Sequence, residues 1–547
     1  MKEYFFLLLL YPFVLFSQSI PIQNKVDWTF AGVRDTNSNN FIIIDVQSYG
    51  VIGDGSTPND LFFSNILSTF VNQDLILNFP AGTFLFNFPI NLSDNIILKG
   101  AGNENTILKF DLGGTSNAIS AEGYVNNLDT AFLTHSAVKD SMYIIVSNSS
   151  FLSNDDWIIL TQNDSDLVTS NWALNTVGQI IKISHIVNNH IYLQSPIRFD
   201  YDIFKQPVVR KLDPVKNIGI ECMKILRVDN TSPQQSSNIF FNYTVNSWVK
   251  SIESENCTFS HIDARFSSNL SISKSYFHDG FEYGSGGRAY GVMLQSTTNE
   301  CLIEDNVFKH LRHSMILQSG ANGNVFAYNY SFDPFWDNTP NNSTGEIVLH
   351  GNYPYANLFE NNICQNIVID NSHGPNGPNN TFFRNRANGY GIIFTSSNSP
   401  NQNIIGNEIT NTNFPYSLVN YTVQGLGHFI YGNNNKGTID PIGTDSLSTL
   451  SYAYNLRPDF IPLNQWGGIG IPNMMGLFNI PAYDRVNNGN IFSSSCDGIS
   501  INTTENNFIK RISKIFDMLG RETQVKNNIP LFYIYDDGTV EKKLIIE

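Results

Sequence analysis

Residues 303–331 read IEDNVFKHLRHSMILQSGANGNVFAYNYS, and this stretch contains one full period of a repeated pattern. The pattern opens with IEDNVF, in which the first and last residues are apolar and the fourth is asparagine. The same frame recurs at 326–331, 359–364, 382–387 and 404–409, and at 272–277 with serine in place of asparagine. From Ser275 onward the fourth positions follow one another at steps of 31, 23, 33, 23 and 22 residues.

A step of about 22 residues is the length of one coil in a parallel β-helix. The apolar side chains of such a coil point inward and are buried only by the coils above and below. Asparagine at a repeated turn tolerates left-handed backbone and can hydrogen-bond to its counterpart in the next coil. We therefore predict an all-β chain built on a single-stranded right-handed parallel β-helix. An ordinary β-sandwich with asparagine-rich turns is the alternative.

A second strand follows the frame in each coil, and its polar residues predict the working face. The segments GVMLQ, SMILQ, EIVLH, NIVID and GIIFT begin at residues 291, 314, 346, 366 and 391. Because side chains alternate along a strand, polar residues at both ends of an apolar triplet form outward rows. The fifth-position row is Gln295, Gln318, His350, Asp370 and Thr395, the first-position row includes Ser314, Glu346 and Asn366, and HIDAR adds His261, Asp263 and Arg265.

The two long steps place their extra residues at the same corner, between the two strands of a coil. These inserts are HDGFEYGSGGRAY at 278–290 and FDPFWDNTPNNSTG at 332–345, and KHLRH forms the short corner between them. We expect the inserts to rise as walls beside a notch. Its floor would consist of Lys309, His310, Arg312 and His313. Such a cluster is placed to meet a ligand, and a solvated run of surface charge is the alternative.

The charge balance limits the partners of this chain. Its 547 residues carry 48 acidic and 32 basic side chains, for a net charge of −16. Such a chain repels nucleic acid and anionic membranes, so an anionic substrate needs a local basic cluster. We expect no nucleic-acid partner and a monomer.

The N-terminus is typical of an exported protein. Residues 1–19, MKEYFFLLLLYPFVLFSQS, place one lysine before an apolar run from Tyr4 to Phe16. This run is short for a membrane span and fits a secretory signal peptide cleaved near Ser17 or Ser19, with an N-terminal anchor as the alternative. We expect no transmembrane segment after cleavage.

The five cysteines are widely spaced and show no metal-ligand spacing. Cys257, Cys301 and Cys364 lie inside strand-like segments, and we interpret them as small core residues rather than halves of disulfides. A disulfide stays open as an alternative in an exported chain.

The stretch DVQSYGVIGDGSTPND at 45–60, followed by NFPAGTFLF at 78–86, resembles the first coil of the pectate-lyase-like superfamily. It is most similar to the rhamnogalacturonase- and epimerase-like branch of right-handed β-helices. The helix start, Thr57-Pro58-Asn59-Asp60, departs from the family pattern. The resemblance covers roughly 43–435 and implies an acidic or neutral polysaccharide as substrate, without choosing between elimination and hydrolysis. The matching residues are Gly50, Gly53, Asp54, Gly55, Pro80, Ala81, Gly82 and Thr83.

The end of the chain resembles the C-terminal sorting domain, type A, of the type IX secretion system. The matching pieces are DMLGR at 517–521, YIY at 533–535 and GTVEKK at 538–543, within short alternating strands split by glycine and asparagine. The resemblance implies export through the periplasm to the outside or the cell surface, with the type IX machinery as partner. The expected organisation is a signal peptide at 1–19, an N-terminal segment at 20–42, the β-helix at 43–440, a wrapping segment and linker at 441–496, and the sorting domain at 497–547.

We expect an enzyme that degrades an extended polysaccharide, and β-elimination on an acidic polymer is the first hypothesis. This reaction needs a cation to neutralise the uronate carboxylate and a base to remove the C5 proton. Arg312 is predicted to hold the carboxylate, with Lys309 or Arg288 assisting, and His313 or His350 is predicted to be the base. No cofactor is required, although calcium is an alternative to the arginine.

Hydrolysis is the first alternative and needs two carboxyls, about 5–5.5 Å apart for retention or about 6.5–9.5 Å for inversion. Glu346 and Asp370 lie in different rows, so strand geometry separates them by well over about 10 Å. Asp263 or Glu282 is the closer partner that we consider. A non-catalytic glycan-binding surface protein is the second alternative. The predicted catalytic residues are His313, Arg312, His350 and Glu346, and the predicted substrate-binding residues are Lys309, His310, Arg288, Gln295, Gln318, Asp370 and Trp336.

Overall fold

The computed structural model describes residues 20–34, 41–229, 234–284, 286–337, 345–418, 422–471, 476–492, 496, 512–517, 521–523, 530–535 and 540–543. The chain divides into two compact units, Met1–Cys496 and Asp497–Glu547. The expected signal peptide lies outside the described residues. Within the described part of the chain, no helix is both long and apolar enough to cross a bilayer.

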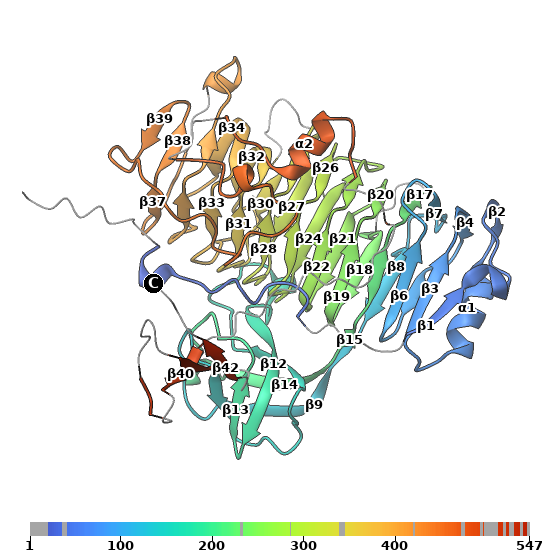
Figure 1. The fold of residues 1–547 in the computed structure, drawn as a ribbon, viewed down its shortest axis with the longest axis horizontal. Coiled ribbons are helices and arrows are strands. Elements are labelled where there is room, and N and C mark those ends of the chain that lie inside the picture. Colours follow the sequence, from blue (N-terminus) through green and yellow to red (C-terminus); the bar gives the residue numbers. More distant parts are fainter. Residues whose placement is uncertain are drawn as a thin grey trace, which may run out of the picture. The chain divides into compact units, whose positions relative to one another are not determined.

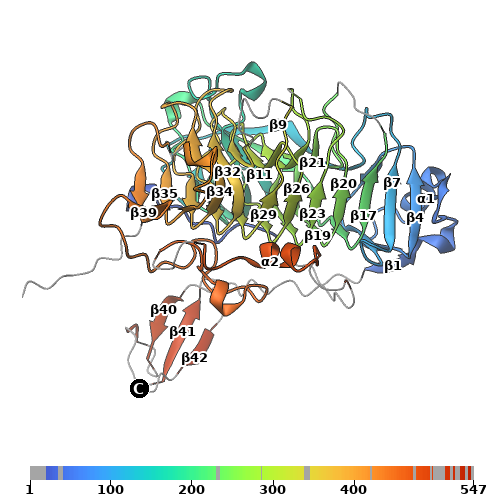
Figure 2. The same ribbon diagram turned by 90° about the horizontal axis from the view of Figure 1, so that it is seen from above.

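The first unit is built mainly of parallel strands that stack coil upon coil along one axis (Figures 1 and 2). Each complete coil gives one strand to each of three columns, which we call sheets I, II and III. The long strands β32 (Ile363–Ile369) and β34 (Arg386–Phe394) pass through both sheet II and sheet III and join them. The parallel β-helix predicted from the sequence is confirmed.

The strands of these sheets are short. Sheet I contains β1 (Ile42–Asp45), β3 (Leu75–Phe79), β6 (Ile96–Gly100), β16 (Gly219–Glu221), β19 (Thr244–Lys250), β22 (Ser268–Ser273), β25 (Leu302–Glu304), β28 (Val325–Ala327), β31 (Leu358–Glu360), β33 (Thr381–Phe383), β35 (Asn403–Ile405) and β37 (Phe429–Tyr431), with β15 (Val215–Lys216) beside β19. Sheet II contains β2 (Asp54–Pro58), β4 (Gly82–Phe86), β7 (Thr106–Phe110), β17 (Lys224–Arg227), β20 (Glu253–Glu255), β23 (Tyr276–His278), β26 (Val307–Lys309), β29 (Tyr330–Phe332), β36 (Glu408–Ile409) and β38 (Asn433–Asn435), and β39 (Thr438–Asp440) pairs antiparallel with β38. Sheet III contains β5 (Ile90–Leu92), β8 (Ile119–Glu122), β18 (Ile239–Asn242), β21 (Ser260–Arg265), β24 (Tyr290–Gln295), β27 (His313–Leu317) and β30 (Ile347–Leu349).

The apolar positions of the repeated frame form the core inside the coils. The ring of Phe359 lies 5.2 Å from the rings of Phe326 and Phe382, one coil away on either side. Helix α1 (Asp60–Thr69) packs Phe63 and Ile66 against the same core at the N-terminal end (Figure 1). The frame's first positions are all fully buried, namely Ile303, Phe326, Phe359, Phe382 and Ile404.

A ladder of asparagine side chains runs through the turn between sheets I and II. Nδ2 of Asn329 donates to the carbonyl of Ile303 (2.8 Å) and to Oδ1 of Asn362 (3.0 Å). The same Oδ1 also accepts the backbone N–H of Asn329 (3.0 Å). The pattern continues without interruption from Asn306 to Asn433. Each side chain therefore satisfies buried backbone groups of the preceding coil and hydrogen-bonds to its counterpart in the next coil, as the sequence predicts.

The backbone of this turn differs from the prediction in one respect. The left-handed conformation falls on the residue before each ladder asparagine, with φ of 56° at Tyr328 and 52° at Asn361. A second ladder, formed by Asn324, Asn357 and Asn380, was not predicted.

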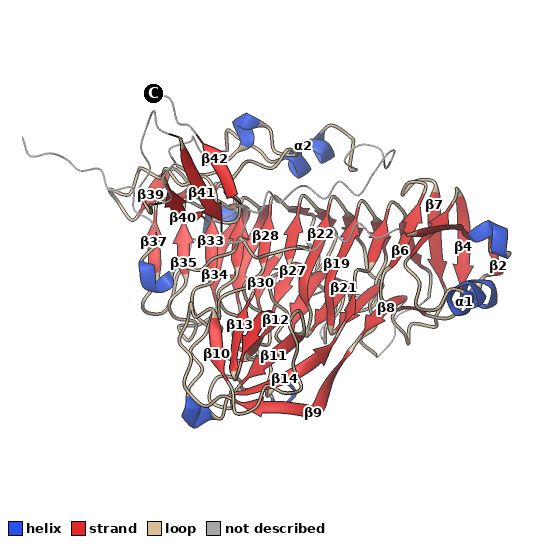
Figure 3. Cartoon of the chain, turned by 60° about the horizontal axis from the view of Figure 1, so that its bottom comes forward, coloured by secondary structure: helices blue, strands red, loops and turns tan. Residues whose placement is uncertain are grey.

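Residues 124–213 leave the β-helix and form an insertion, which corrects the prediction that the β-helix runs through 43–440. They build an antiparallel sheet with the strand order β10-β13-β12-β11-β14-β9 below the parallel strands (Figure 3). Ile158, Ile181 and Tyr201 are fully buried in a separate hydrophobic core of the insertion. The strands are β9 (Tyr124–Phe132), β10 (Tyr143–Ile145), β11 (Trp157–Thr161), β12 (Gly178–Val187), β13 (His190–Leu193) and β14 (Val208–Asp213).

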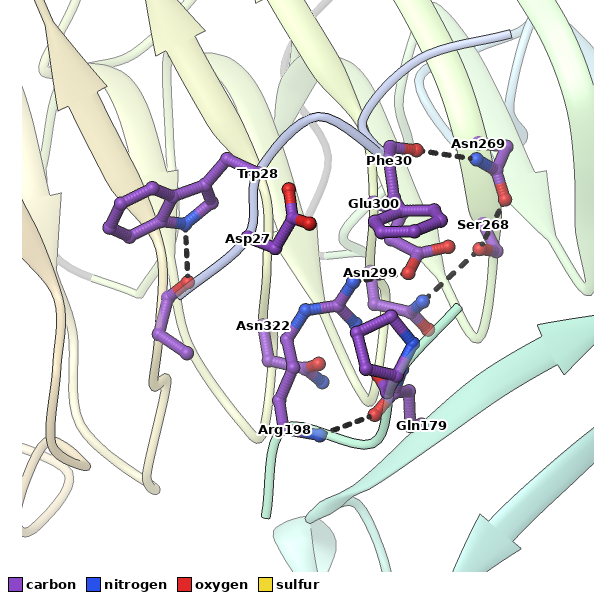
Figure 4. A network of polar contacts seen from close by, with 12 residues as sticks. Asp27, Trp28, Phe30, Gln179, Arg198, Ser268, Asn269, Asn299, Glu300 and Asn322 are labelled. Atoms are coloured by element: carbon purple, nitrogen blue, oxygen red, sulfur yellow. Dashed lines mark hydrogen bonds and ion pairs between the residues drawn. The ribbon is translucent and has the colours of Figure 1, made fainter. Parts of the chain in front are cut away.

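Polar side chains at the turns of the coils dock the insertion (Figure 4). Oδ1 of Asn299 accepts the N–H of Ile180 (2.8 Å), and its Nδ2 donates to the carbonyl of Ile180 (2.9 Å), as a neighbouring strand would. Arg198 forms a buried ion pair with Glu300, and its backbone N–H donates to Oε1 of Gln179 (3.0 Å). The insertion is therefore held in a defined position beside the coils.

Both ends of the first unit run along the outside of the stack. Residues 20–34 pass from Asn403, which accepts a hydrogen bond from Asn24 (3.2 Å), to Asn246, which accepts one from the backbone of Arg34 (3.1 Å).

The segment after β39 runs back along the stack, whereas the sequence predicts a wrapping segment and linker at 441–496. Helix α2 (Pro481–Asn487) reaches the coil of β25 and β26, where Arg485 lies 2.6 Å from Asp305 (Figure 1).

The cysteines fall into two groups. Cys222 and Cys496 form a disulfide, which ties the end of the C-terminal segment to an early coil. Cys257, Cys301 and Cys364 are buried and free, so the prediction that they are small core residues is confirmed.

The second unit contains a small antiparallel sheet, as predicted. Its strands are β40 (Ile512–Phe516), β41 (Leu531–Tyr535) and β42 (Val540–Lys543), with β41 in the middle.

Replacement of Asn362 by alanine should destabilise the β-helix by about 3 kcal/mol, because it leaves the buried carbonyl of Phe326 and the buried backbone N–H of Asn329 without partners. The urea midpoint of the first unit measures this effect. The matched control is Asn87→Ala, because Asn87 is exposed. Equal midpoints for the two variants would show that the ladder contributes nothing to stability.

Candidate active site

The outer face of sheet III carries the fifth-position row predicted from the sequence. The strand register aligns Leu294, Leu317, Leu349 and Ile369, so the residues that follow them lie in one line. Nε2 of Gln318 donates to Oε1 of Gln295 (2.8 Å). Nε2 of Gln295 in turn donates to Oδ1 of Asp263 (2.8 Å). This line of hydrogen-bonded side chains leads along the face toward His350 and Asp370.

The two long loops stand at the start of sheet III, but they do not leave an open notch. The rings of Tyr283 and Phe335 meet edge to face with centroids 5.0 Å apart. The backbone N–H of Asp337 also donates to the carbonyl of Tyr283 (3.5 Å). The described parts of the two loops therefore touch each other over the short corner.

Lys309 and His310 lie on the sheet II side of this corner, so the prediction that they share a notch floor with Arg312 and His313 is wrong. Lys309 ends β26 in register with His278. The ring of His310 stacks on Phe335 at 5.0 Å, and its Nδ1 lies 3.0 Å from Oδ2 of Asp333. The fixed alternation of side chains along β26 and the left-handed φ of 52° at His310 explain this placement.

Arg312 and His313, in contrast, lie beside sheet III. The guanidinium carbon of Arg312 is 4.8 Å from the ring centre of Trp336 and 5.8 Å from that of Tyr290. Arg312 also donates to the carbonyl of Gly284. Its Nε is buried and has no hydrogen-bond partner among the described residues. Cation–π contacts of this kind contribute about 0.5–2 kcal/mol and leave the guanidinium charge unneutralised.

His313 is held as a neutral imidazole with a defined tautomer. Its Nδ1 lies 2.6 Å from the carbonyl of Gly345. Because a carbonyl can only accept, Nδ1 carries the hydrogen and Nε2 is the basic nitrogen. Burial lowers the pKa of His313 to about 3, and the charges of His350 and Arg312 contribute to the shift.

His350 and Asp370 form an imidazole–carboxylate pair on adjoining coils. Nδ1 of His350 lies 2.6 Å from Oδ2 of Asp370. Burial alone would raise the pKa of Asp370, but hydrogen bonding to His350, and the positive charge of His350 when it is protonated, lower the pKa below the usual range. Asp370 is therefore an anion, and it favours a hydrogen on the Nδ1 of His350. No described residue hydrogen-bonds to the Nε2 of His350.

A row of rings crosses the face at this pair and ends on the insertion. The ring centroids of His313 and His350 are 5.8 Å apart, and those of His350 and His373 are 4.8 Å apart. His373 meets Trp172 of the insertion edge to face at 5.8 Å. The side chain of Trp172 is 53% exposed. The insertion therefore forms one side of the candidate site.

Glu346, a predicted catalytic residue, is fully buried and turned away from this row. Its Oε2 accepts the backbone N–H groups of Gln365 and Asn366, the latter at 3.0 Å. Burial raises the pKa of Glu346 to about 8, so the carboxyl is protonated at neutral pH. A substrate on the face has no access to it, and we assign Glu346 a structural role.

The other predicted polar residues are engaged elsewhere. Arg288 lies 3.3 Å from Glu282 within the first long loop. Asp263 is 2.8 Å from the guanidinium of Arg265 in addition to its bond from Gln295.

One group of possible metal ligands, Glu253, Glu255 and His278, lies on sheet II. The ammonium of Lys224 bonds to both of these glutamates, at 2.9 Å from Glu253. The group is therefore already neutralised, which does not favour a calcium site there.

Three members of the site were missed or undervalued by the sequence analysis. Trp172 lies in the unpredicted insertion, Tyr290 precedes the aligned segment of its strand, and His373 follows the last residue of its aligned segment by three positions. A hairpin signal was available for the insertion, because VNNHIY places two asparagines between apolar runs, and Asn188 has a left-handed φ of 52°.

The fold and the site define a parallel β-helix with a row of imidazoles on its outer face. The family model described as "Rhamnogalacturonase A/epimerase, pectate lyase-like" matches residues 43–189. The search of curated proteins found no match.

Solved structures share the fold at low sequence identity. The tailspike protein gp49 from Pseudomonas phage LKA1 superposes with a TM-score of 0.51 at 15% identity, over 67% of this chain and 64% of the tailspike. The Gp54 tailspike of Acinetobacter baumannii bacteriophage AP22, solved in complex with A. baumannii capsular saccharide, gives 0.39 at 14% identity, over 74% and 73% of the two chains. A hyperthermoactive exopolygalacturonase from Thermotoga maritima gives 0.38 at 12% identity, over 75% and 94%.

The pH dependence of stability should change when Glu346 is replaced by glutamine. The pKa of Glu346 is raised on folding, so its contribution to stability is complete below about pH 4 and is lost as the pH rises toward 8. Glu346→Gln keeps a neutral side chain at every pH, so the urea midpoint should depend less on pH between about pH 5 and about pH 8 than it does in the parent. The control is the exposed Glu104→Gln. A pH profile in Glu346→Gln as steep as that of the parent would contradict the assignment.

Proposed function

We propose that this chain is a secreted or cell-surface enzyme that cleaves an acidic polysaccharide by β-elimination. The observation that carries the proposal is the pairing of His350 with Asp370, at 2.6 Å, within the row of rings on the outer face of sheet III. The family model that matches residues 43–189 names a rhamnogalacturonase and an epimerase and is described as pectate lyase-like, which supports the proposal.

His350 is the proposed base. The carboxylate of Asp370 keeps a hydrogen on Nδ1, which leaves Nε2 free to accept a proton from the substrate. Nε2 removes the C5 proton of a uronate residue, and the C–H electron pair forms the C4–C5 double bond. The C4–O bond then breaks, and the departing oxygen takes up a proton from water. His313 stays neutral beside this base, since burial lowers its pKa to about 3.

Arg312 is the proposed partner of the uronate carboxylate. Negative charge spreads onto that carboxylate as the C5 proton leaves, and a fixed cation stabilises it. The described contacts of Arg312 are with two aromatic rings and a carbonyl, so its charge is not neutralised by a carboxylate. Arginine can supply this charge without calcium.

Hydrolysis receives less support from the carboxyls near the site. Hydrolysis needs two carboxyls that flank one bond, one of them as acid. Asp370 is paired with His350, Asp263 is paired with Arg265, and Glu346 is buried against backbone N–H groups. Elimination uses an imidazole and a cation, and both are found at the row.

The proposal includes export. The Cys222–Cys496 disulfide suits an oxidising compartment outside the cytosol. The antiparallel strands of the second unit suit a sorting domain of the type IX secretion system, with that machinery as the partner. We propose that the exported chain acts as a monomer on an extended polymer.

Replacement of His350 by alanine should lower kcat by about 10²-fold or more, because the base is lost. The assay uses polygalacturonate and alginate and follows the ultraviolet absorbance of unsaturated products. His135→Ala is the matched control, because His135 is exposed on the insertion. New reducing ends without unsaturated products would show that the enzyme acts by hydrolysis and would contradict elimination.

Arg312→Ala should lower kcat/KM by about 10²-fold, and Arg312→Lys should recover part of the loss because it keeps the positive charge. Circular dichroism of both variants checks that the fold is intact. Turnover of Arg312→Ala close to that of the parent would remove the residue from the reaction.

A further inference from the structure

The insertion carries a groove that the proposed reaction does not use. Its volume is about 430 Å³. The lining combines polar, apolar and basic side chains, including Phe132, Thr161, Leu174, Asn175, Lys205 and Arg210. Phe132 is 55% exposed and Leu174 is 42% exposed, so apolar surface is open to a ligand.

The groove lies on the face of the insertion sheet that is turned toward the coils. Arg210 of β14 pairs directly with Ile159 of β11, so the two side chains share one face. Ile159 belongs to the cluster in which Leu212 of the insertion packs with Val245 of β19. One part of this face therefore docks on the β-helix, and the part around Arg210 stays open.

Arg210 supplies a positive charge to the groove. Its guanidinium donates to the hydroxyl of Thr161 (3.3 Å), and it forms no ion pair with any described residue. The other basic residue, Lys205, lies 2.6 Å from Asp166. The carboxylate of Asp164 accepts the backbone N–H groups of Asn175 and Val177, at 2.8 and 3.0 Å. Arg210 is therefore the cation that an acidic ligand would meet.

The chain itself connects this groove to the row of imidazoles. Leu174 and Asn175 line the groove, and the carbonyl of the next residue, Thr176, accepts a hydrogen bond from Thr297 at the end of β24 (2.6 Å). In the other direction, Trp172 contacts His373. The 53% exposed indole of Trp172 thus lies between the groove and the proposed base.

We propose that the insertion holds a second saccharide subsite, in which Arg210 binds a carboxylate of the acidic polymer and Trp172 stacks on a sugar ring between Arg210 and the imidazole row. The class of ligand rests on the proposed function. An acidic chain of net charge −16 attracts a polyanion only where a cation is left unpaired, and Arg210 is such a cation. The indole offers the flat apolar surface that sugar rings bind.

Kinetics on substrates of different length test this subsite. Arg210→Gln should raise KM for polygalacturonate or alginate by about fivefold or more and leave kcat within about twofold, because the subsite binds polymer and does not react. Trp172→Ala should raise KM for the same polymers as well. On the shortest oligosaccharide that is cleaved, which does not reach Arg210, Arg210→Gln should not change KM. The matched controls are Lys211→Gln, next to Arg210 and paired with Asp156, and Tyr143→Ala on another strand of the insertion.

Affinity electrophoresis in gels that contain the same polymers, with dextran as the neutral control, separates failure of the subsite from failure of the proposed reaction. His350→Ala should be retarded like the parent, whereas Arg210→Gln should lose retardation. Loss of retardation in Arg210→Gln without any cleavage by the parent would support the subsite and overturn the elimination. Equal retardation and equal KM for Arg210→Gln, Trp172→Ala and an active parent would overturn the subsite alone. A parent that neither binds nor cleaves would overturn both.

Discussion

Hydrogen bonding of asparagine side chains between successive coils is the interaction on which this fold depends. A coil of a parallel β-helix has turns whose backbone groups are buried by the next coil, and each unpaired group costs about 1–3 kcal/mol. Asn329 and Asn362 solve this problem in the same way, since each donates its side-chain amide to a carbonyl of the preceding coil and its backbone N–H to the asparagine of the next. The repeated geometry fixes the register of sheets I, II and III, and with it the line of side chains on the outer face.

This regularity made much of the fold predictable from sequence. Asparagine at the fourth position of each repeated frame indicated the coil length. The apolar triplets indicated which residues of neighbouring strands lie side by side, and the pairing of Leu317 with Leu349 confirms this register. The insertion was not predictable in the same way, because the repeat simply stops there and antiparallel strands follow. Its docking depends on single contacts such as Asn299 with Ile180, between residues far apart in the chain and without any shared pattern.

The candidate site was predicted in part for the same reason. Alternation along a strand places His350 and Asp370 outward on neighbouring coils, so their proximity follows from the register. At the corners between strands, side chains do not alternate between the two faces of a sheet. Only Leu311 separates Lys309 and His310 from Arg312 and His313. The left-handed conformation at residue 310 nevertheless places the two pairs beside different sheets. Whether the long loops stand apart or meet depends on ring contacts such as that of Tyr283 with Phe335. The spacing of the sequence repeat does not predict such contacts between loops.

Two imidazoles that share one face can have different chemical roles because their second nitrogens meet different partners. His313 donates to a carbonyl, which fixes its tautomer but adds little negative charge, and burial keeps it neutral. His350 faces the carboxylate of Asp370, which stabilises the imidazolium that forms when a proton is taken up. In the proposed reaction, His350 therefore gains stabilisation from direct contact with this carboxylate at the moment of proton transfer. The choice of the proposed base thus depends on the neighbouring coil, through the residue that occupies position 370.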